Sequence, residues 1–265
     1  MTTLSSIILT LILFFCGASL GSFFCVIVTR STHSGPASKR SRCDYCHQQL
    51  KTRDLFPVIG YLLNKGQCRY CEKSIPKWYF WAELSGGLLF ALLALGIWNN
   101  LFTHPFFNSP QSFLFVFSLF CFTGVLYLIS LFDNAYFWVP KQLIYLLIGI
   151  SLASISWPIT LQTAIEKVLG GIIGGSLVGG QYLITGKKGL GLGDVFISLA
   201  TGFYLGWQYF LVALISGYSL AVIVNIPKYL TKKRATIRQK IPLAPYFLIG
   251  VVMALLMGSS IISLY

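Results

Sequence analysis

Residues 189–207 read GLGLGDVFISLATGFYLGW. The glycine-rich part, residues 189–194, ends on Asp194, and an apolar segment follows it directly. The chain has only 7 Asp and Glu residues among its 265, and Asp194 is the last of them. A carboxylate at the edge of a membrane helix is costly to keep charged, so such residues are commonly functional. The stretch therefore predicts a membrane helix that begins at a candidate functional aspartate.

The composition of the whole chain indicates a membrane protein. Hydrophobic residues make up 55% of the chain and charged residues 10%, whereas a soluble domain carries about 25% charged residues. A chain of this composition cannot cover itself with a charged, water-facing exterior, which excludes the soluble globular class. We expect an all-α polytopic membrane protein.

Eight apolar runs are separated by polar or glycine-containing segments. The expected spans cover residues 4–29, 78–98, 112–132, 143–157, 163–185, 194–206, 209–226 and 242–264. A run of about 20 residues is needed to cross a bilayer, and the sixth run is the shortest. We divide the chain into a first membrane helix (1–29), a polar cysteine-rich loop (30–77) and a membrane core of about seven spans (78–265).

The basic residues predict the orientation of the spans. The formal net charge is +13, and 19 of the 20 Lys and Arg residues follow the first, third, fifth and seventh runs. Such residues collect in cytoplasmic loops, so we expect both termini outside and the basic loops against the anionic leaflet of the lipid bilayer. No basic segment is interleaved with aromatic residues, so we expect no nucleic-acid partner.

This orientation brings two distant carboxylates to the cytoplasmic face. Asp133 follows the third run and Asp194 begins the sixth. Two close carboxylates share a proton, so one can accept a proton from water while the other donates to a scissile carbonyl. A helix cap is the alternative for Asp194, whereas a carboxylate at a helix C-terminus, as expected for Asp133, is disfavoured. The pair predicts an aspartic protease, in which Gly191 and Gly193 allow a substrate strand to approach the backbone.

The fifth run is rich in glycine. Its glycines are Gly170, Gly171, Gly174, Gly175, Gly179 and Gly180. Glycine repeated every four residues in an apolar helix is typical of a close helix-packing surface. The alternative, a phosphate-binding loop, is disfavoured because no Lys-Ser or Lys-Thr ending follows.

Four cysteines of the polar loop predict a metal site. They form two C-x-x-C pairs, Cys43 with Cys46 and Cys68 with Cys71, with 21 residues between the pairs. The spacing suits four thiolates around Zn²⁺. Two disulfides are the alternative, but cytoplasmic thiols stay reduced. We expect the zinc to be structural, since four sulfur ligands close the site, and His47 is an alternative ligand.

Several motifs together resemble the bacterial type IV prepilin peptidases. Phe132-Asp133, followed after five residues by Val139-Pro140, is similar to their first active-site motif. Gly191-Leu192-Gly193-Asp194 resembles their G-x-G-D motif. The cysteine loop and the segment Ile241–Tyr246 also resemble the family, so the likeness extends over nearly the whole chain.

The resemblance implies a membrane aspartic endopeptidase with Asp133 and Asp194 as catalytic residues. Its substrates would be prepilins or pseudopilins, whose basic leader it would remove at the cytoplasmic face of the bacterial inner membrane. Many members also methylate the new N-terminus with S-adenosylmethionine, which implies substrate or methyl-donor handling by Glu83, Gly191 and Gly193.

Two alternatives remain open at this point. One is a presenilin-like intramembrane protease, which shares the G-x-G-D motif; the cysteine loop and the lack of a Pro-Ala-Leu triplet argue against it. The other is a non-enzymatic transporter or assembly scaffold.

Overall fold

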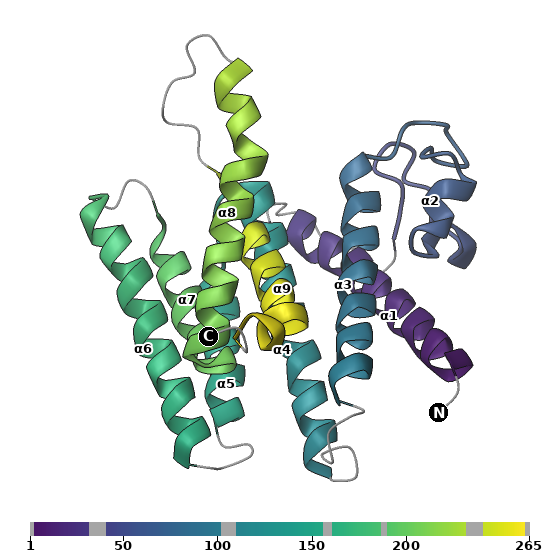
Figure 1. Cartoon of the computed structure of the whole chain (residues 1–265). Coiled ribbons are helices and arrows are strands. Elements are labelled where there is room, and N and C mark those ends of the chain that lie inside the picture. Colours follow the sequence, from purple (N-terminus) through teal and green to yellow (C-terminus); the bar gives the residue numbers. More distant parts are fainter. Residues whose placement is uncertain are drawn as a thin grey trace. The chain divides into compact units, whose positions relative to one another are not determined.

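A computed structural model describes residues 3–31, 41–101, 110–155, 161–186, 190–231 and 241–262. The chain divides into two compact units, Met1–Trp98 and Asn99–Tyr265. Over the described residues the fold is all-α, with two isolated β-bridges and no longer strand (Figure 1). The proposed division of the chain at residues 29 and 77 stays a prediction, and both positions fall inside the first unit.

The first unit consists of two long helices with the cysteine loop between them. Its elements are α1 (Thr3–Arg30), the short 3-10 helix η1 (Thr52–Leu55), α2 (Ile59–Leu63) and α3 (Lys77–Leu101). Glycines bring the long helices together: a Cβ added at Gly17 would collide with the carbonyl oxygen of Gly86. At Gly21 it would lie 2.5 Å from the carbonyl oxygen of Ala82. Small residues therefore set the distance between α1 and α3.

The second unit is a bundle of six helices. They are α4 (Pro110–Tyr136), α5 (Lys141–Ile155), α6 (Leu161–Ile184), α7 (Leu192–Leu205), α8 (Trp207–Thr231) and α9 (Ala244–Ile262). Helix α7 packs against α5, α6 and α8, and α9 packs against α4 and α8. The helix that carries Asp194 is thus enclosed by neighbours on several sides.

The glycines of the fifth apolar run form the packing surface between α6 and α7. A Cβ added at Gly170 would collide with the carbonyl oxygen of Gly202, and one added at Gly202 with that of Gly170. A Cβ at Gly174 would lie 2.5 Å from the carbonyl oxygen of Ser198. The backbones of the two helices touch, which confirms the packing interpretation.

Several helices have the length and composition of membrane spans. Four qualify by both criteria, over residues Leu4–Arg30, Lys77–Ile97, Leu114–Tyr136 and Trp207–Ile226. Shorter apolar helices cover Lys141–Ser154, Leu192–Leu205 and Ala244–Met257. The chain is an all-α multi-pass membrane protein, as its composition predicts. Helix α7 is short: 14 residues reach about 21 Å, less than the ~30 Å of the hydrocarbon core.

Each of the eight predicted runs corresponds to a helix, and two differences at the ends concern the aspartates. Helix α7 begins at Leu192, so Asp194 is its third residue and not its first. Helix α4 continues to Tyr136, so Asp133 lies within its last turn. Residues 187–189, which precede and begin the glycine-rich stretch, and Trp157 of the fourth run lie outside the described residues.

Candidate active site and metal centre

Asp194 is fixed at the N-terminus of α7 by a local hydrogen bond. The backbone N–H of Gly191 donates to Asp194 Oδ2 at 2.9 Å, and the N–H of Asp194 donates to the carbonyl oxygen of Gly191 at 3.1 Å. Gly191 has extended backbone angles, φ −83° and ψ 151°. A carboxylate is favoured in the first turn of a helix, so Asp194 has the geometry of a helix cap. The capping alternative therefore describes part of what this residue does.

Asp133 is held by a helix other than its own. Its Oδ2 accepts a hydrogen bond at 3.0 Å from the backbone N–H of Ala244, the first residue of α9. The residue lies in the last turn of α4, where the helix dipole opposes a negative charge. The N-terminus of α9 supplies the compensating N–H donor. This contact explains how a carboxylate is accommodated at an unfavourable helix end.

The two aspartates meet around Ala244. Ala244, which binds Asp133, also lines a small cavity beside Asp194. The cavity is lined by Asp194, Ile197, Ser198, Tyr218, Leu243, Ala244 and Phe247. Its volume of about 10 Å³ is the room needed by one water molecule. A water-sized space thus lies beside Asp194, and Ala244, which binds Asp133, forms part of its wall.

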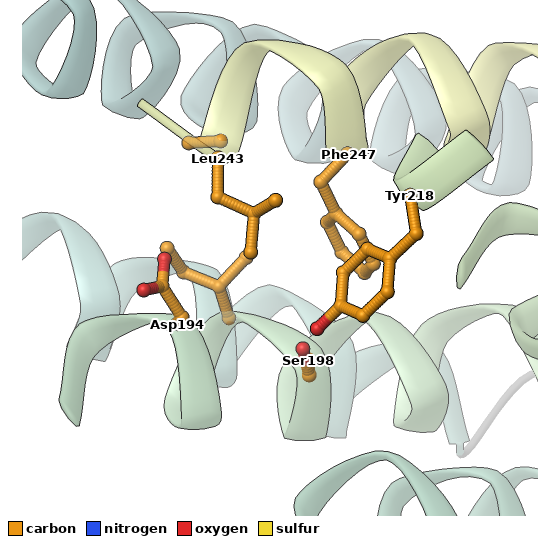
Figure 2. A pocket seen from close by; sticks show the side chains of 7 residues that line it. Asp194, Ser198, Tyr218, Leu243 and Phe247 are labelled. Carbon is orange, nitrogen blue, oxygen red and sulfur yellow. The ribbon is translucent and has the colours of Figure 1, made fainter. Parts of the chain in front are cut away.

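Three helices build the wall of this cavity (Figure 2). Asp194 and Ser198 come from α7, Phe247 comes from the first turn of α9, and Leu243 directly precedes that helix. The hydroxyl of Tyr218 points from α8 toward Ser198. The Tyr218 hydroxyl donates to Gln181 Oε1 of α6 at 2.9 Å. This bond fixes the ring beside the N-terminal half of α7.

The sequence interpretation missed Ser198, Tyr218 and Ala244. Ser198 follows Asp194 by four residues, a spacing that places two side chains on one helix face, so it was open to prediction. Tyr218 lies within an apolar run and gives no signal. The contribution of Ala244 is a backbone N–H, which residue type does not reveal.

The two glycines named from the sequence lie beside Asp194 in the chain. Gly191 donates its backbone N–H to Asp194, and a Cβ added at Gly193 would lie 3.7 Å from Ile144.

The four cysteines of the loop form one cluster. Their Sγ atoms all lie within 4.8 Å of one another, and those of Cys43 and Cys71 are 3.8 Å apart. Four sulfurs at about 2.3 Å from a tetrahedral Zn²⁺ would be about 3.8 Å apart, whereas a disulfide needs about 2.0 Å. The cysteines are free thiols in the structure. The cluster therefore fits a metal ion, and His47 is not part of it.

The two C-x-x-C pairs have the same backbone geometry. The N–H groups of His47 and Glu72 donate to the carbonyl oxygens of Cys43 and Cys68, respectively, at 2.9 Å in both cases. His47 and Glu72 both have positive φ, 55° and 59°. An isolated β-bridge flanks each turn, Arg42 with Gln49 and Gln67 with Ser74. Two turns with the same backbone geometry thus bring the four thiols together in one cluster.

Backbone donors favour ionisation of the first cysteine. Burial raises the pKa of the Cys43 thiol, but hydrogen bonds from the backbone at Cys46 and Tyr45 outweigh burial and lower the pKa to about 7. The thiolate is the form of cysteine that binds metal ions.

Glu83 is bound to the cysteine loop. Its Oε2 accepts a hydrogen bond at 2.8 Å from the backbone N–H of Val58. Val58 has a positive φ of 64°, an unusual conformation for a β-branched residue. The contact fixes Val58 against α3 within the first unit.

Comparison with known proteins identifies the family. A model described as the bacterial peptidase A24 N-terminal domain matches residues 15–97, and a model of the type IV leader peptidase family matches residues 120–226. A prepilin leader peptidase/N-methyltransferase of Bacillus subtilis is 30% identical over 258 residues, covering 96% of each chain. The chain belongs to the type IV leader peptidase family.

Other members of the leader peptidase family match as well. A prepilin leader peptidase/N-methyltransferase of Stutzerimonas stutzeri is 29% identical over 85% of this chain and 74% of its own. A type 4 prepilin-like proteins leader peptide-processing enzyme of Escherichia coli is 31% identical over 64% of this chain and 60% of its own. No solved structure shows a significant match. As a member of this family, the protein is a peptidase. The region matched by the second family model, residues 120–226, contains both Asp133 and Asp194.

Proposed function

We propose that this protein is an aspartic endopeptidase that removes the basic leader from type IV prepilins or pseudopilins. The observation that carries the proposal is the convergence of Asp133 and Asp194 around Ala244, beside a water-sized cavity. Relatives whose names describe prepilin leader processing support the substrate class. The scaffold and transporter alternatives give no reason for a carboxylate pair with this arrangement.

The proposed mechanism uses the two carboxylates in opposite protonation states. Two neighbouring carboxylates repel one another when both are charged, so they hold one proton between them. The charged member takes a proton from the water molecule, which attacks the scissile carbonyl carbon. The neutral member donates its proton to the carbonyl oxygen. Collapse of the tetrahedral intermediate then breaks the C–N bond: the aspartate that took a proton from water gives it to the leaving amine, and the other aspartate takes a proton back from a hydroxyl of the intermediate, so the pair again holds one proton.

We place the reaction at the cytoplasmic face of the bacterial inner membrane, with both termini outside. Support comes from the distribution of the Lys and Arg residues and from the positions of Asp133 and Asp194 at helix ends, away from the middle of the spans. The apolar helix of the substrate would enter the bilayer, and its basic leader would stay in the aqueous phase.

We propose that the cysteine cluster binds a structural Zn²⁺. The ligands would be Cys43, Cys46, Cys68 and Cys71, whose sulfurs lie at the separations of a tetrahedral site. A site closed by four sulfurs has no open position for substrate. The metal would therefore hold the shape of the loop and take no part in peptide hydrolysis.

Replacing Cys43 by serine should remove the zinc. We expect one zinc ion per chain in the wild-type protein and almost none in Cys43→Ser, because a hydroxyl is a much poorer ligand than a thiolate at a four-sulfur site. Cys16→Ser is the matched control, since Cys16 is exposed on α1 and outside the cluster. Metal analysis of the purified proteins measures this. A Cys43→Ser protein with wild-type zinc content would refute the proposed site.

Methylation of the new N-terminus with S-adenosylmethionine is a further part of the proposal. It rests on the names of the relatives, which include N-methyltransferase. Glu83 was expected to handle substrate or methyl donor, and its carboxylate is occupied by the Val58 N–H. This bond ties the position of Glu83 to the loop.

Mass spectrometry of a prepilin co-expressed with this protein tests the proposal. We expect a product cut between the basic leader and the apolar helix, and a methyl group on the new N-terminus if methylation occurs. Cleavage within the apolar helix would instead support a presenilin-like intramembrane protease. An uncut prepilin, from cells in which the protein is folded and in the membrane, would support the non-enzymatic alternatives.

A further inference from the structure

The cysteine loop contains an apolar segment that the first unit leaves exposed. Residues 55–63 read LFPVIGYLL. The exposed fractions are 42% for Leu55, 48% for Phe56, 38% for Ile59, 58% for Leu62 and 74% for Leu63. A loop in water has no reason to present five large apolar side chains in nine residues. The segment therefore needs an apolar environment.

Contacts with the two long helices show that this segment lies alongside them. The rings of Phe56 and Phe15 are 5.6 Å apart, and those of Tyr61 and Phe80 are 5.1 Å apart. Phe15 precedes Arg30, the end of α1, by 15 residues, or about 22 Å along the helix axis. The segment thus lies beside the membrane spans and not beyond their ends, and α2 is seen next to α3 in Figure 1.

The hydrogen bond to Glu83 ties the segment to the first turns of α3 as well. Glu83 is the seventh residue of α3, which begins at Lys77. Its carboxylate therefore lies about 9 Å along the helix from that end. It binds the N–H of Val58 in the middle of the segment.

The backbone of the segment is suited to an apolar environment. Non-helical backbone enters an apolar phase only where its polar groups are satisfied. The N–H of Val58 is satisfied by Glu83, and those of Gly60 and Leu62 donate to the carbonyl oxygens of Phe56 and Val58. The one hydrogen bond thus gives the Glu83 carboxylate a donor within an apolar helix and gives the Val58 N–H an acceptor.

Charge at both ends of the segment completes the pattern. Lys51 and Arg53 precede it, Lys65 follows it, and all three side chains are exposed. An apolar centre flanked by basic residues is complementary to a bilayer with anionic headgroups, because the long basic side chains reach the phosphates while the centre enters the acyl region.

We propose that residues 55–63 insert into the lipid bilayer beside α1 and α3, as a membrane-inserted arm of the cysteine loop. The partner is lipid, with acyl chains against Leu55, Leu62 and Leu63 and anionic headgroups at the basic flanks. Glu83 positions the arm by holding Val58. The arm anchors the metal-binding half of the loop at the membrane surface. This inference does not depend on the proposed peptidase activity.

Photo-crosslinking to lipid tests the arm. A diazirine amino acid is introduced at position 62 or 63 of the full-length protein, which is reconstituted in vesicles of phosphatidylcholine and phosphatidylglycerol and irradiated. Position 45 is the matched control, since Tyr45 is in the same loop, is 61% exposed and lies in the first C-x-x-C turn. Mass spectrometry of the digested protein counts lipid adducts, and an unchanged thermal unfolding midpoint verifies that each variant is folded.

We expect lipid adducts at positions 62 and 63 to exceed those at position 45 by at least several-fold. Removal of phosphatidylglycerol should reduce the adducts, because the basic flanks then lose their anionic headgroups. Water adducts at 62 and 63 at the level of position 45 would overturn the proposal. Cross-links from these positions to another part of this chain, or to a second copy, would also overturn it, because the apolar face would then cover protein and not lipid.

Discussion

Asp133→Asn and Asp194→Asn are each expected to lower the rate of leader removal by roughly 10²–10⁴-fold without unfolding the protein. Asparagine is nearly the same size as aspartate and keeps one side-chain oxygen. The N–H groups of Ala244 and Gly191 therefore retain an acceptor. The amide cannot exchange a proton with water or with the scissile carbonyl, so the variants separate catalysis from capping.

Cleavage of a purified prepilin in detergent measures this effect, and Glu166→Gln is the control. Glu166 undergoes the same carboxyl-to-amide change within the second unit and contacts Gln162 of its own helix. It should keep wild-type activity. Processing by both aspartate variants at the wild-type rate would show that the carboxylates only cap α7 and α9, and would refute the dyad.

Replacing Gly170 by alanine is expected to lower the thermal unfolding midpoint strongly. The added Cβ would meet backbone atoms of Gly202, Gly206 and Trp207, none of which can rotate away. Overpacking of this kind costs about 1–3 kcal/mol or more. Because α6 is the neighbour that α7 contacts through its backbone, separation of these helices would also displace Asp194, so activity should fall with stability.

Gly180→Ala is the matched control on the same helix. A Cβ at Gly180 would have no atom within 4 Å among the described residues. Alanine is favoured over glycine in a helix interior by roughly 1 kcal/mol. Its unfolding midpoint should therefore equal or exceed that of the wild type. Equal midpoints for Gly170→Ala and Gly180→Ala in a detergent melting experiment would contradict the close contact between α6 and α7.

The helices were predictable from the sequence because a membrane imposes a simple rule. A span must be apolar over most of its length, so each run from residue 4 to residue 264 gives a clear signal. The glycine surface of α6 was predictable for a related reason, since helices in lipid associate through small residues. The cysteine cluster depends on local spacing, and the repeated turns at Cys43 and Cys68 bring the thiols together.

The immediate surroundings of the aspartates were not predictable in the same way. Loop charges predict that Asp133 and Asp194 lie at one membrane face, but they carry no information on which helix ends touch. The contact between Asp133 and Ala244 joins residues 111 positions apart through a backbone N–H. The bond between Glu83 and Val58 is of the same kind. A backbone donor is present in nearly every residue, so residue type gives no indication of its partner.

The bond between Asp133 and α9 has a consequence for the timing of biosynthesis. A nascent chain contains both aspartates once residue 194 has been made. It still lacks the Ala244 amide and the side of the cavity formed by Leu243, Ala244 and Phe247. Under the proposed function, the site around the two aspartates is thus completed only when α9 has been made. A peptidase built in this order has no assembled site while its own apolar helices are emerging from the ribosome.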